Sequence, residues 1–196
     1  GGGAYCTGGT GSVIGLSSST TGVNYQLFRG STLVTTVAGT GSSISFGSMT
    51  TVGTYTVVAT NISTGCTNTM SGSVNVVINS LPNAYAVIGG GNYCAGGSGV
   101  HIGLNNSATG ISYQLYNGAT PAGSPVIGTG SPIDFGLLTA AGTYTTIATD
   151  GSTSCSSNMI GSVSVGINPL VAPAVTISTG VGTNVCSGEV VTFTAM

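Results

Sequence analysis

The segment GTYTVVATN at residues 53–61 is repeated, with three changes, as GTYTTIATD at residues 142–150. The segments around it are repeated in the same order. Further matching pairs are GGAYCTGGTGSVIGL (2–16) with GGNYCAGGSGVHIGL (90–104), GVNYQLF (22–28) with GISYQLY (110–116), and SGSVNVVIN (71–79) with IGSVSVGIN (160–168). Cys94 follows Cys6 by 88 residues, and Cys186 follows Cys94 by 92. A period of this length is that of one small β-domain, so the sequence predicts a tandem array.

The repeat frame predicts three parts: residues 1–80, residues 81–169 and, at residues 170–196, the start of a third unit. The chain begins just before the second strand of the unit, so the first part is expected to lack its own strand A. Residues 170–196 are expected to supply only strands A and B. We therefore expect the C-terminal segment of one copy to complete the first domain of the next, either as the continuation of a longer chain or by strand donation between subunits.

Charged side chains are almost absent from this sequence. Only 2% of the residues are charged, Lys is missing, and the formal net charge is −2 over 196 residues. Such a chain has no basic surface for phosphate backbones, which excludes nucleic acid as a partner. Mean hydropathy is +0.47, but the apolar residues alternate with Ser and Thr, and no run reaches the ~18–20 residues that a spanning helix needs. We therefore expect no membrane insertion.

Short β-branched and aromatic runs, separated by Gly, Ser, Thr and Asn, predict an all-β chain with almost no helix. In the second unit strands are expected at residues 84–89 (A), 100–104 (B), 111–116 (C), 124–127 (C′), 132–135 (E), 142–149 (F) and 161–168 (G). This pattern is typical of an immunoglobulin-like β-sandwich. We expect two such domains stacked end to end through short connectors at residues 81–82 and 169–173.

Alternation along the predicted strands indicates which side chains point into each sandwich. In the first domain the expected inward set is Val23, Tyr25, Leu27, Tyr55, Val57, Ala59, Val74, Val76 and Ile78. The Gly-Thr-Tyr run that opens each strand F resembles the tyrosine corner of such sandwiches, in which the phenol hydroxyl bonds back to the backbone between strands E and F. Tyr55 and Tyr144 are therefore interpreted as structural residues.

Two motifs carry a resemblance to a known family. The first is the run Cys-x-Gly-Gly-x-Gly-x-x-Ile-Gly-Leu before strand B, and the second is a Gly-Thr-Tyr-Thr strand followed by Gly-Cys or Ser-Cys. Together they resemble the Ig-like repeats of very large secreted surface proteins, or adhesins, of the Bacteroidetes group, and the resemblance covers the whole chain in register. It implies export to the cell surface and a role as an adhesin or filament component.

The five cysteines occupy two fixed places in the unit. Cys6, Cys94 and Cys186 precede strand B, whereas Cys66 and Cys155 follow strand F. This recurrence predicts disulfides and an oxidising compartment. A zinc site is disfavoured, because zinc needs four ligands close together and these cysteines are far apart in sequence.

Two disulfide pairings stay open. The first lies within units, as Cys6–Cys66 and Cys94–Cys155, and leaves Cys186 for a partner beyond the chain. However, the two cysteine places lie at opposite ends of a sandwich, roughly 17–23 Å apart for strands of five to seven residues, whereas the Cα atoms of a disulfide lie within about 7 Å. The second pairing, Cys6–Cys155, joins the two domains and leaves Cys66 and Cys94 for neighbouring units. A long loop that folds back would permit the first.

The groups that an enzyme would need are few: Asp134, Asp150, Glu189, His101 and Arg29. None is shared between the units, and their positions suggest neither paired carboxylates nor a Ser–His–Asp grouping. His101 occupies an outward position of strand B and is interpreted as a solvent-facing substitution. We therefore expect no enzyme activity, no cofactor and no metal site.

Two function classes remain. The first is a structural repeat of an extracellular filament or giant adhesin, whose partners are neighbouring copies or repeats of the same protein. The alternative is a carbohydrate-binding accessory module that contacts surface glycans through an aromatic platform. Its candidate aromatic residues are Phe28, Tyr116, Tyr5 and Tyr93. Both classes place the protein outside the cell, at the surface or in a secreted filament.

Overall fold

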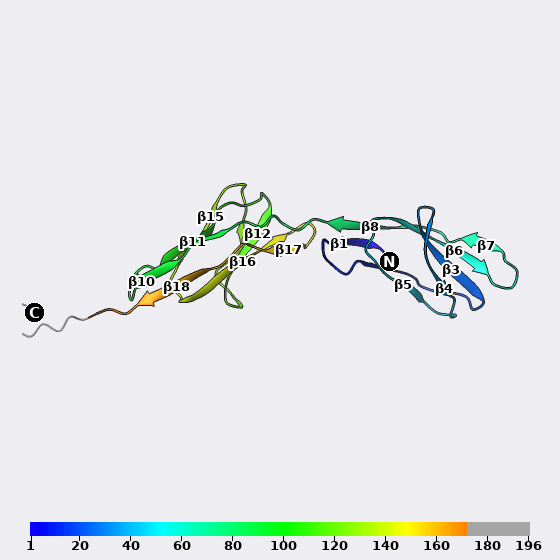
Figure 1. Cartoon of the computed structure of the whole chain (residues 1–196), viewed down its shortest axis with the longest axis horizontal. Coiled ribbons are helices and arrows are strands. Elements are labelled where there is room, and N and C mark those ends of the chain that lie inside the picture. Colours follow the sequence, from blue (N-terminus) through cyan, green and yellow to red (C-terminus); the bar gives the residue numbers. More distant parts are fainter. Residues whose placement is uncertain (172–196) are drawn as a thin grey trace, which may run out of the picture.

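The computed structural model describes residues 1–171, so the strands expected at residues 170–196, and Cys186 with them, lie outside the described residues apart from residues 170 and 171. The described part is all-β, as the sequence predicts, and contains no helix. Its strands form two sandwiches that lie end to end in an elongated molecule (Figure 1). The N-terminus lies near the middle of the molecule, beside the junction between the sandwiches.

The first domain contains strands β1 (Gly3–Cys6), β2 (Ser12–Leu16), β3 (Val23–Arg29), β4 (Thr32–Ala38), β5 (Ile44–Met49), β6 (Gly53–Asn61), β7 (Thr67–Thr69) and β8 (Val74–Asn79). One sheet has the order β1-β8-β6-β3-β4, with β7 also pairing with β6, and the facing sheet is the pair β2-β5. All pairs are antiparallel except β1 with β8, which run parallel.

The second domain contains strands β9 (Val87–Gly89), β10 (Gly91–Cys94), β11 (Val100–Leu104), β12 (Ile111–Asn117), β13 (Thr120–Pro121), β14 (Val126–Ile127), β15 (Ile133–Leu138), β16 (Gly142–Asp150), β17 (Ser156–Asn158) and β18 (Val163–Asn168). The larger sheet has the order β10-β18-β16-β12-β13, with β14 on β12 and β17 on β16. The smaller sheet has the order β15-β11-β9. Its third strand, β9, has no counterpart among the described residues of the first domain.

Each core is built from alternate residues of the central strands. Leu27, Tyr113 and Leu115 are fully buried, and Tyr25 is nearly so. Strand F is β6 in the first domain and β16 in the second. The register of β3 with β6, and of β12 with β16, sets these residues opposite the buried residues of strand F. The larger sheets of the two domains therefore bury the same face. Ile78, which the alternation places inward, is instead 39% exposed, because β8 pairs there only with β1, at the end of the sandwich.

Three departures from the predicted strands have local causes. No strand was expected at β1 or β10, yet each pairs in parallel with the last strand of its domain. Strand C′ is continuous as β4 but is split into β13 and β14, where Pro121 and Pro125 remove backbone donors. The predicted strand G begins earlier, as β17, and is interrupted near Gly161, whose φ is 76°.

The tyrosine at the start of each strand F closes the loop before it. The Tyr55 hydroxyl donates to the Thr51 carbonyl at 2.7 Å, and the Tyr144 hydroxyl donates to the Ala140 carbonyl at 2.7 Å. Both rings are almost completely buried. Each phenol therefore links the core to the backbone between strands E and F.

Among residues 1–171, one buried side-chain oxygen has no hydrogen-bond partner. Thr146 is 1% exposed, and its Oγ1 makes no hydrogen bond. In the first domain the same position of strand F is Val57, an apolar residue of nearly the same shape. The second domain therefore carries the cost of an unsatisfied hydroxyl that the first domain avoids.

The substitution Tyr144→Phe should lower the free energy of unfolding of the second domain by about 1–2 kcal/mol, because the Ala140 carbonyl loses its donor while packing is kept. Hydrogen exchange of peptides from each domain measures the effect. Tyr116→Phe, at a half-buried ring that alternates with Leu115, serves as the control and should change little. Equal effects of the two substitutions would contradict the structural role of the Tyr144 hydroxyl.

The substitution Thr146→Val should raise the free energy of unfolding of the second domain by about 1 kcal/mol, because it removes the unsatisfied hydroxyl at nearly constant volume. The matched control is Val57→Thr, which should destabilise the first domain by a similar or larger amount. Denaturant unfolding followed by domain-resolved hydrogen exchange measures both. A destabilising Thr146→Val would show that the hydroxyl has a partner.

Candidate functional site at the joint between the domains

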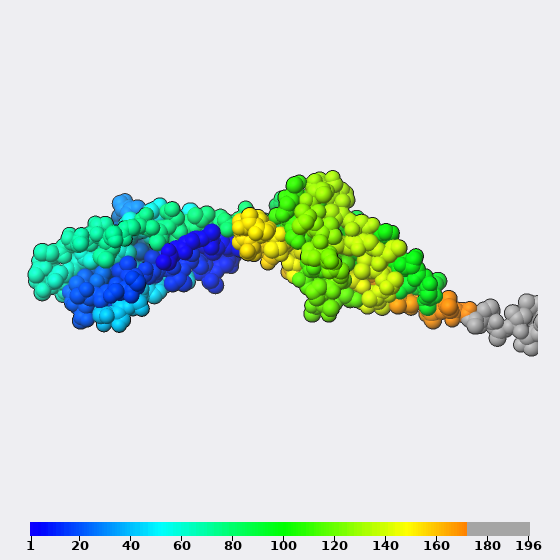
Figure 2. Space-filling model, turned by 180° about the vertical axis from the view of Figure 1, so that it is seen from behind, coloured from blue at the N-terminus to red at the C-terminus, as the bar shows by residue number. Residues whose placement is uncertain are grey.

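A disulfide joins the two domains. Cys6 and Cys155 are bonded, with Cα atoms 5.6 Å apart, and they are 149 residues apart in sequence. Figure 2 shows the loop between β16 and β17, in yellow, against the blue N-terminal segment at the junction. Because the chain itself also crosses this junction, the two sandwiches are connected at two separate points.

Cys6 is held at the end of β1. Its register partner is Asn79, the last residue of β8. The Asn79 carbonyl accepts hydrogen bonds from the Thr7 amide at 2.9 Å and the Thr7 hydroxyl at 3.0 Å. The Gly9 amide donates to the Cys6 carbonyl at 2.8 Å and closes a turn behind the cysteine. These contacts place Cys6 at the end of the first domain from which the connector leaves.

Cys155 is held by a tight loop that follows β16. The Asp150 amide donates to the Cys155 carbonyl at 2.9 Å, and the Ser154 amide donates to the Asp150 carbonyl at 2.8 Å. The Asp150 carboxylate accepts from the Ser152 hydroxyl at 2.6 Å and the Ser152 amide at 2.8 Å. These two hydrogen bonds hold the pKa of Asp150 below its ordinary value. Cys155 itself is completely buried.

The connector packs against the same end of the second domain. The Ser157 hydroxyl donates to the Pro82 carbonyl at 2.7 Å, and Pro82 is buried. Further along, the Ile160 amide donates to the Tyr85 carbonyl at 2.8 Å, and the Val87 amide donates to the Ile160 carbonyl at 2.9 Å. The connector and the residues up to β9 are therefore hydrogen-bonded to the second domain.

Within residues 1–171, the two remaining cysteines lie in different domains. The structure has the pairing between domains, and it forms neither Cys6–Cys66 nor Cys94–Cys155. Cys66 and Cys94 are exposed and free. The separation of the two cysteine places along the strands was the sequence signal for this pairing. The hydrogen-bonded loop that orients Cys155 towards the neighbouring domain could not be recognised in the sequence, because its Ser and Thr residues are ordinary turn residues.

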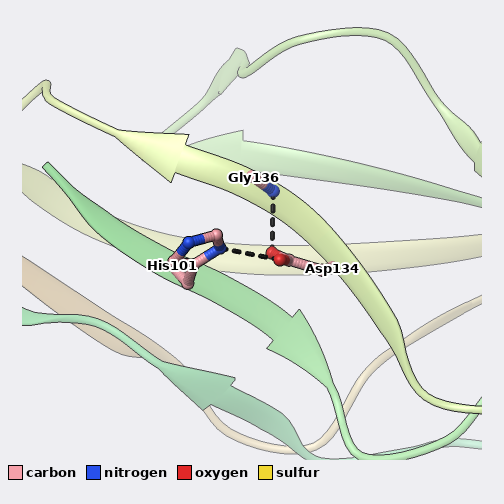
Figure 3. A network of polar contacts seen from close by, with 3 residues as sticks. All are labelled: His101, Asp134 and Gly136. Atoms are coloured by element: carbon pink, nitrogen blue, oxygen red, sulfur yellow. Dashed lines mark hydrogen bonds and ion pairs between the residues drawn. The ribbon is translucent and has the colours of Figure 1, made fainter. Parts of the chain in front are cut away.

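His101 and Asp134 form a surface pair that the sequence did not bring together. Strands β11 and β15 are neighbours, and the His101 Nδ1 atom lies 2.7 Å from the Asp134 Oδ2 atom (Figure 3). Asp134 also accepts from the Gly136 amide at 2.8 Å. The His101 and Asp134 side chains are 64% and 57% exposed, and the shallow pocket beside them is lined by no Ser, Thr or Cys. The pair therefore lacks a nucleophile and contributes only a weak surface interaction.

Other kinds of site find little support within residues 1–171. There, no three His, Cys, Asp or Glu side chains gather where they could bind a metal ion. Over the same residues, no helix has the length and hydropathy needed to cross a membrane. Two of the four candidate platform residues are engaged: the Tyr5 and Tyr93 hydroxyls donate to the Thr50 and Thr139 carbonyls, and both rings pack against the cores. The other two, Phe28 and Tyr116, are half-buried.

Comparisons with solved structures find other β proteins at low identity. The fibronectin(III)-like modules of Clostridium thermocellum CbhA are 14% identical, with a TM-score of 0.46, over 86% of this chain and 90% of that chain. The human OSCAR ligand-binding domain is 14% identical, with a TM-score of 0.33, over 77% of this chain and 86% of that chain. A chimeric titin Z1Z2 tandem is 14% identical, with a TM-score of 0.30, over 85% and 95%.

No curated protein sequence matches this chain. The model of the family described as "Ig-like domain CHU_C associated" does match, at residues 82–169. These are the residues that form the second sandwich, and over them the match confirms the Ig-like resemblance inferred from the cysteine-glycine and Gly-Thr-Tyr-Thr motifs. Residues 82–169 are therefore similar to the Ig-like domains of the family described as CHU_C associated.

Proposed function

We propose that this chain is a structural repeat of an extracellular bacterial surface filament or giant adhesin. It supplies length and stiffness, and it multiplies weak contacts with the cell surface or with other cells. The observation that carries the proposal is the Cys6–Cys155 bond between the domains. A disulfide within one domain would stabilise that domain, whereas this bond stabilises the orientation of one domain relative to the next.

The surface supports the same proposal. Ser, Thr, Asn and Gly replace charged residues, so neighbouring molecules repel one another only weakly. The disulfide is consistent with an oxidising, extracellular location. Ig-like domains of this kind are generally non-catalytic, which fits a structural role. The carbohydrate-binding alternative is not favoured, because every Tyr and Phe within residues 1–171 is buried or half-buried, and sugar rings stack on exposed aromatic faces.

Electron microscopy of the native material tests the proposed function. We expect long, thin, beaded fibres in which each bead is one sandwich, because the joint favours end-to-end arrangement. A monodisperse monomer at micromolar concentration, stable without any neighbour, would contradict the filament function and favour the binding-module alternative.

The double substitution Cys6→Ser with Cys155→Ser tests the stiffness of the joint. Both sandwiches should stay folded by circular dichroism, but the angle between them should vary more widely in negative-stain images and small-angle scattering. Unfolding should also become easier, by at most about 5 kcal/mol in the chain-entropy model for a loop of this length. Cys66→Ser with Cys94→Ser is the matched control and should leave the angle unchanged. An unchanged angle distribution in the first variant would show that the connector alone holds the joint.

A further inference from the structure

The two free cysteines occupy the same positions within their domains as the two bonded cysteines, but they lie at the outer ends of the molecule. Cys94 occupies in the second domain the place that Cys6 occupies in the first, and Cys66 occupies in the first domain the place of Cys155 in the second. One end of the molecule therefore carries half of the observed joint, and the other end carries the complementary half.

The loop that holds Cys66 has the same shape as the loop that holds the disulfide-bonded Cys155, although Cys66 itself is not bonded to another domain. The Asn61 amide donates to the Cys66 carbonyl at 2.9 Å, and the Gly65 amide donates to the Asn61 carbonyl at 2.9 Å. These are the counterparts of the hydrogen bonds that hold Cys155. Gly65 has a φ of 69°, and Ser154, a non-glycine residue in the left-handed region, has a φ of 60° at the same place. The backbone of the Cys66 loop is therefore already in the form that the bonded loop has.

The end that carries Cys94 likewise repeats the end that carries Cys6. Cys94 is in register with Asn168, the last residue of β18. The Ala95 amide donates to the Asn168 carbonyl at 2.8 Å, and the Gly97 amide donates to the Cys94 carbonyl at 2.9 Å. Both halves of the joint are thus preformed.

The apolar residues at this same end are more exposed than their counterparts at the observed joint. Pro82 of the connector is buried against the second domain, and Leu81 is 39% exposed. The residues at the corresponding places after β18, Leu170 and Val171, are 74% and 85% exposed. Burying such side chains is favourable, at roughly 25 cal/mol per Å² of apolar surface removed from water.

The first domain also has room for the strand that a neighbour would bring. In the second domain, Tyr85 and Val87 bond to Ile160, next to the buried Met159. In the first domain the counterpart residues Met70 and Ser71 line an open groove, together with Ile14, Leu16, Leu27 and Val74. This groove lies where the second domain receives its connector.

We propose that a second copy of this chain docks head to tail, with Cys94 of one copy bonded to Cys66 of the next, in a repetition of the Cys6–Cys155 joint. The proposal rests on the filament function and names the partner at each end. The contact is heterologous, since two different surfaces meet, and the same step can be repeated indefinitely. It produces a fibre with a disulfide at every junction.

The chemistry is thiol–disulfide exchange with a small disulfide such as oxidised glutathione. The thiolate of one cysteine attacks the oxidant, forms a mixed disulfide and releases one glutathione thiolate. The second cysteine then attacks the protein sulfur of the mixed disulfide and expels the other glutathione. Each new Cys94–Cys66 bond therefore consumes two protein thiols and one oxidised glutathione, and it yields two reduced glutathiones.

Two single-thiol variants test the proposal on the full chain, both with Cys186→Ser so that Cys186 takes no part in the reaction. The first adds Cys66→Ser and keeps Cys94, and the second adds Cys94→Ser and keeps Cys66. Each variant is incubated with oxidised glutathione, alone and mixed in equal amounts, and is then run on a non-reducing gel. We expect the mixture to form dimers at least tenfold faster than either variant alone, and Cys186→Ser by itself to form a ladder of multimers.

Mapping of the bonds identifies the pair. Peptic digestion in acid suits this chain, because trypsin has only Arg29 as a cleavage site and acid suppresses exchange. A crosslinked peptide that contains Cys94 and Cys66 supports the proposal. Dimers of either variant alone at the rate of the mixture, or thiols that stay unpaired in the mixture, would overturn it.

The same materials distinguish this proposal from the proposed function. Native fibres that lack the Cys94–Cys66 bond would overturn the disulfide joint between copies and leave the filament function standing. A fast, specific mixed dimer from a protein whose native material holds no fibres would support the joint and contradict the filament.

Discussion

The bond between Cys6 and Cys155 is the constraint on which the arrangement of the molecule depends. A single connector between two sandwiches leaves their orientation free unless a large interface holds it, and here the contact between the domains is confined to their ends. The disulfide adds a second attachment beside the connector, which itself is hydrogen-bonded to the second domain through Pro82. Two attachments restrict bending and twisting in a way that one cannot.

The two domains serve as controls for one another, because the same fold is built twice with small differences. Asn61 and Asp150 accept the same hydrogen bonds from the serine two residues later, so the cysteine loop does not require a charge. Val57 and Thr146 occupy the same buried place, and only the threonine leaves a polar atom unsatisfied. Conversely, Ser19 and Ser107 each donate to a backbone carbonyl at 2.6 Å, which explains why both are buried without penalty.

Much of the fold could be predicted from local patterns. Alternation located the central strands around Tyr25 and Tyr113, because a buried sheet face requires every second residue to be apolar. Positions at the ends of the sandwich were less predictable. Ile78 follows the inward pattern but lies at the end of its strand, and the parallel pairing of β1 and β10 depends on a strand that comes much later in the chain. His101 and Asp134 are likewise distant in sequence and meet only because β11 and β15 are adjacent.

The sequence by itself determined the all-β class, the repeat, the low charge and the two places that the cysteines occupy, because these follow from composition and spacing along the chain. The strand lengths also placed those cysteines at opposite ends of a sandwich. Only the tertiary structure decided which cysteines meet. That choice depends on the path of the connector and on the loop from Asp150 to Cys155, whose hydrogen bonds turn Cys155 towards the preceding domain. Contacts between residues so far apart in sequence arise from how the domains pack, and local sequence patterns do not predict them.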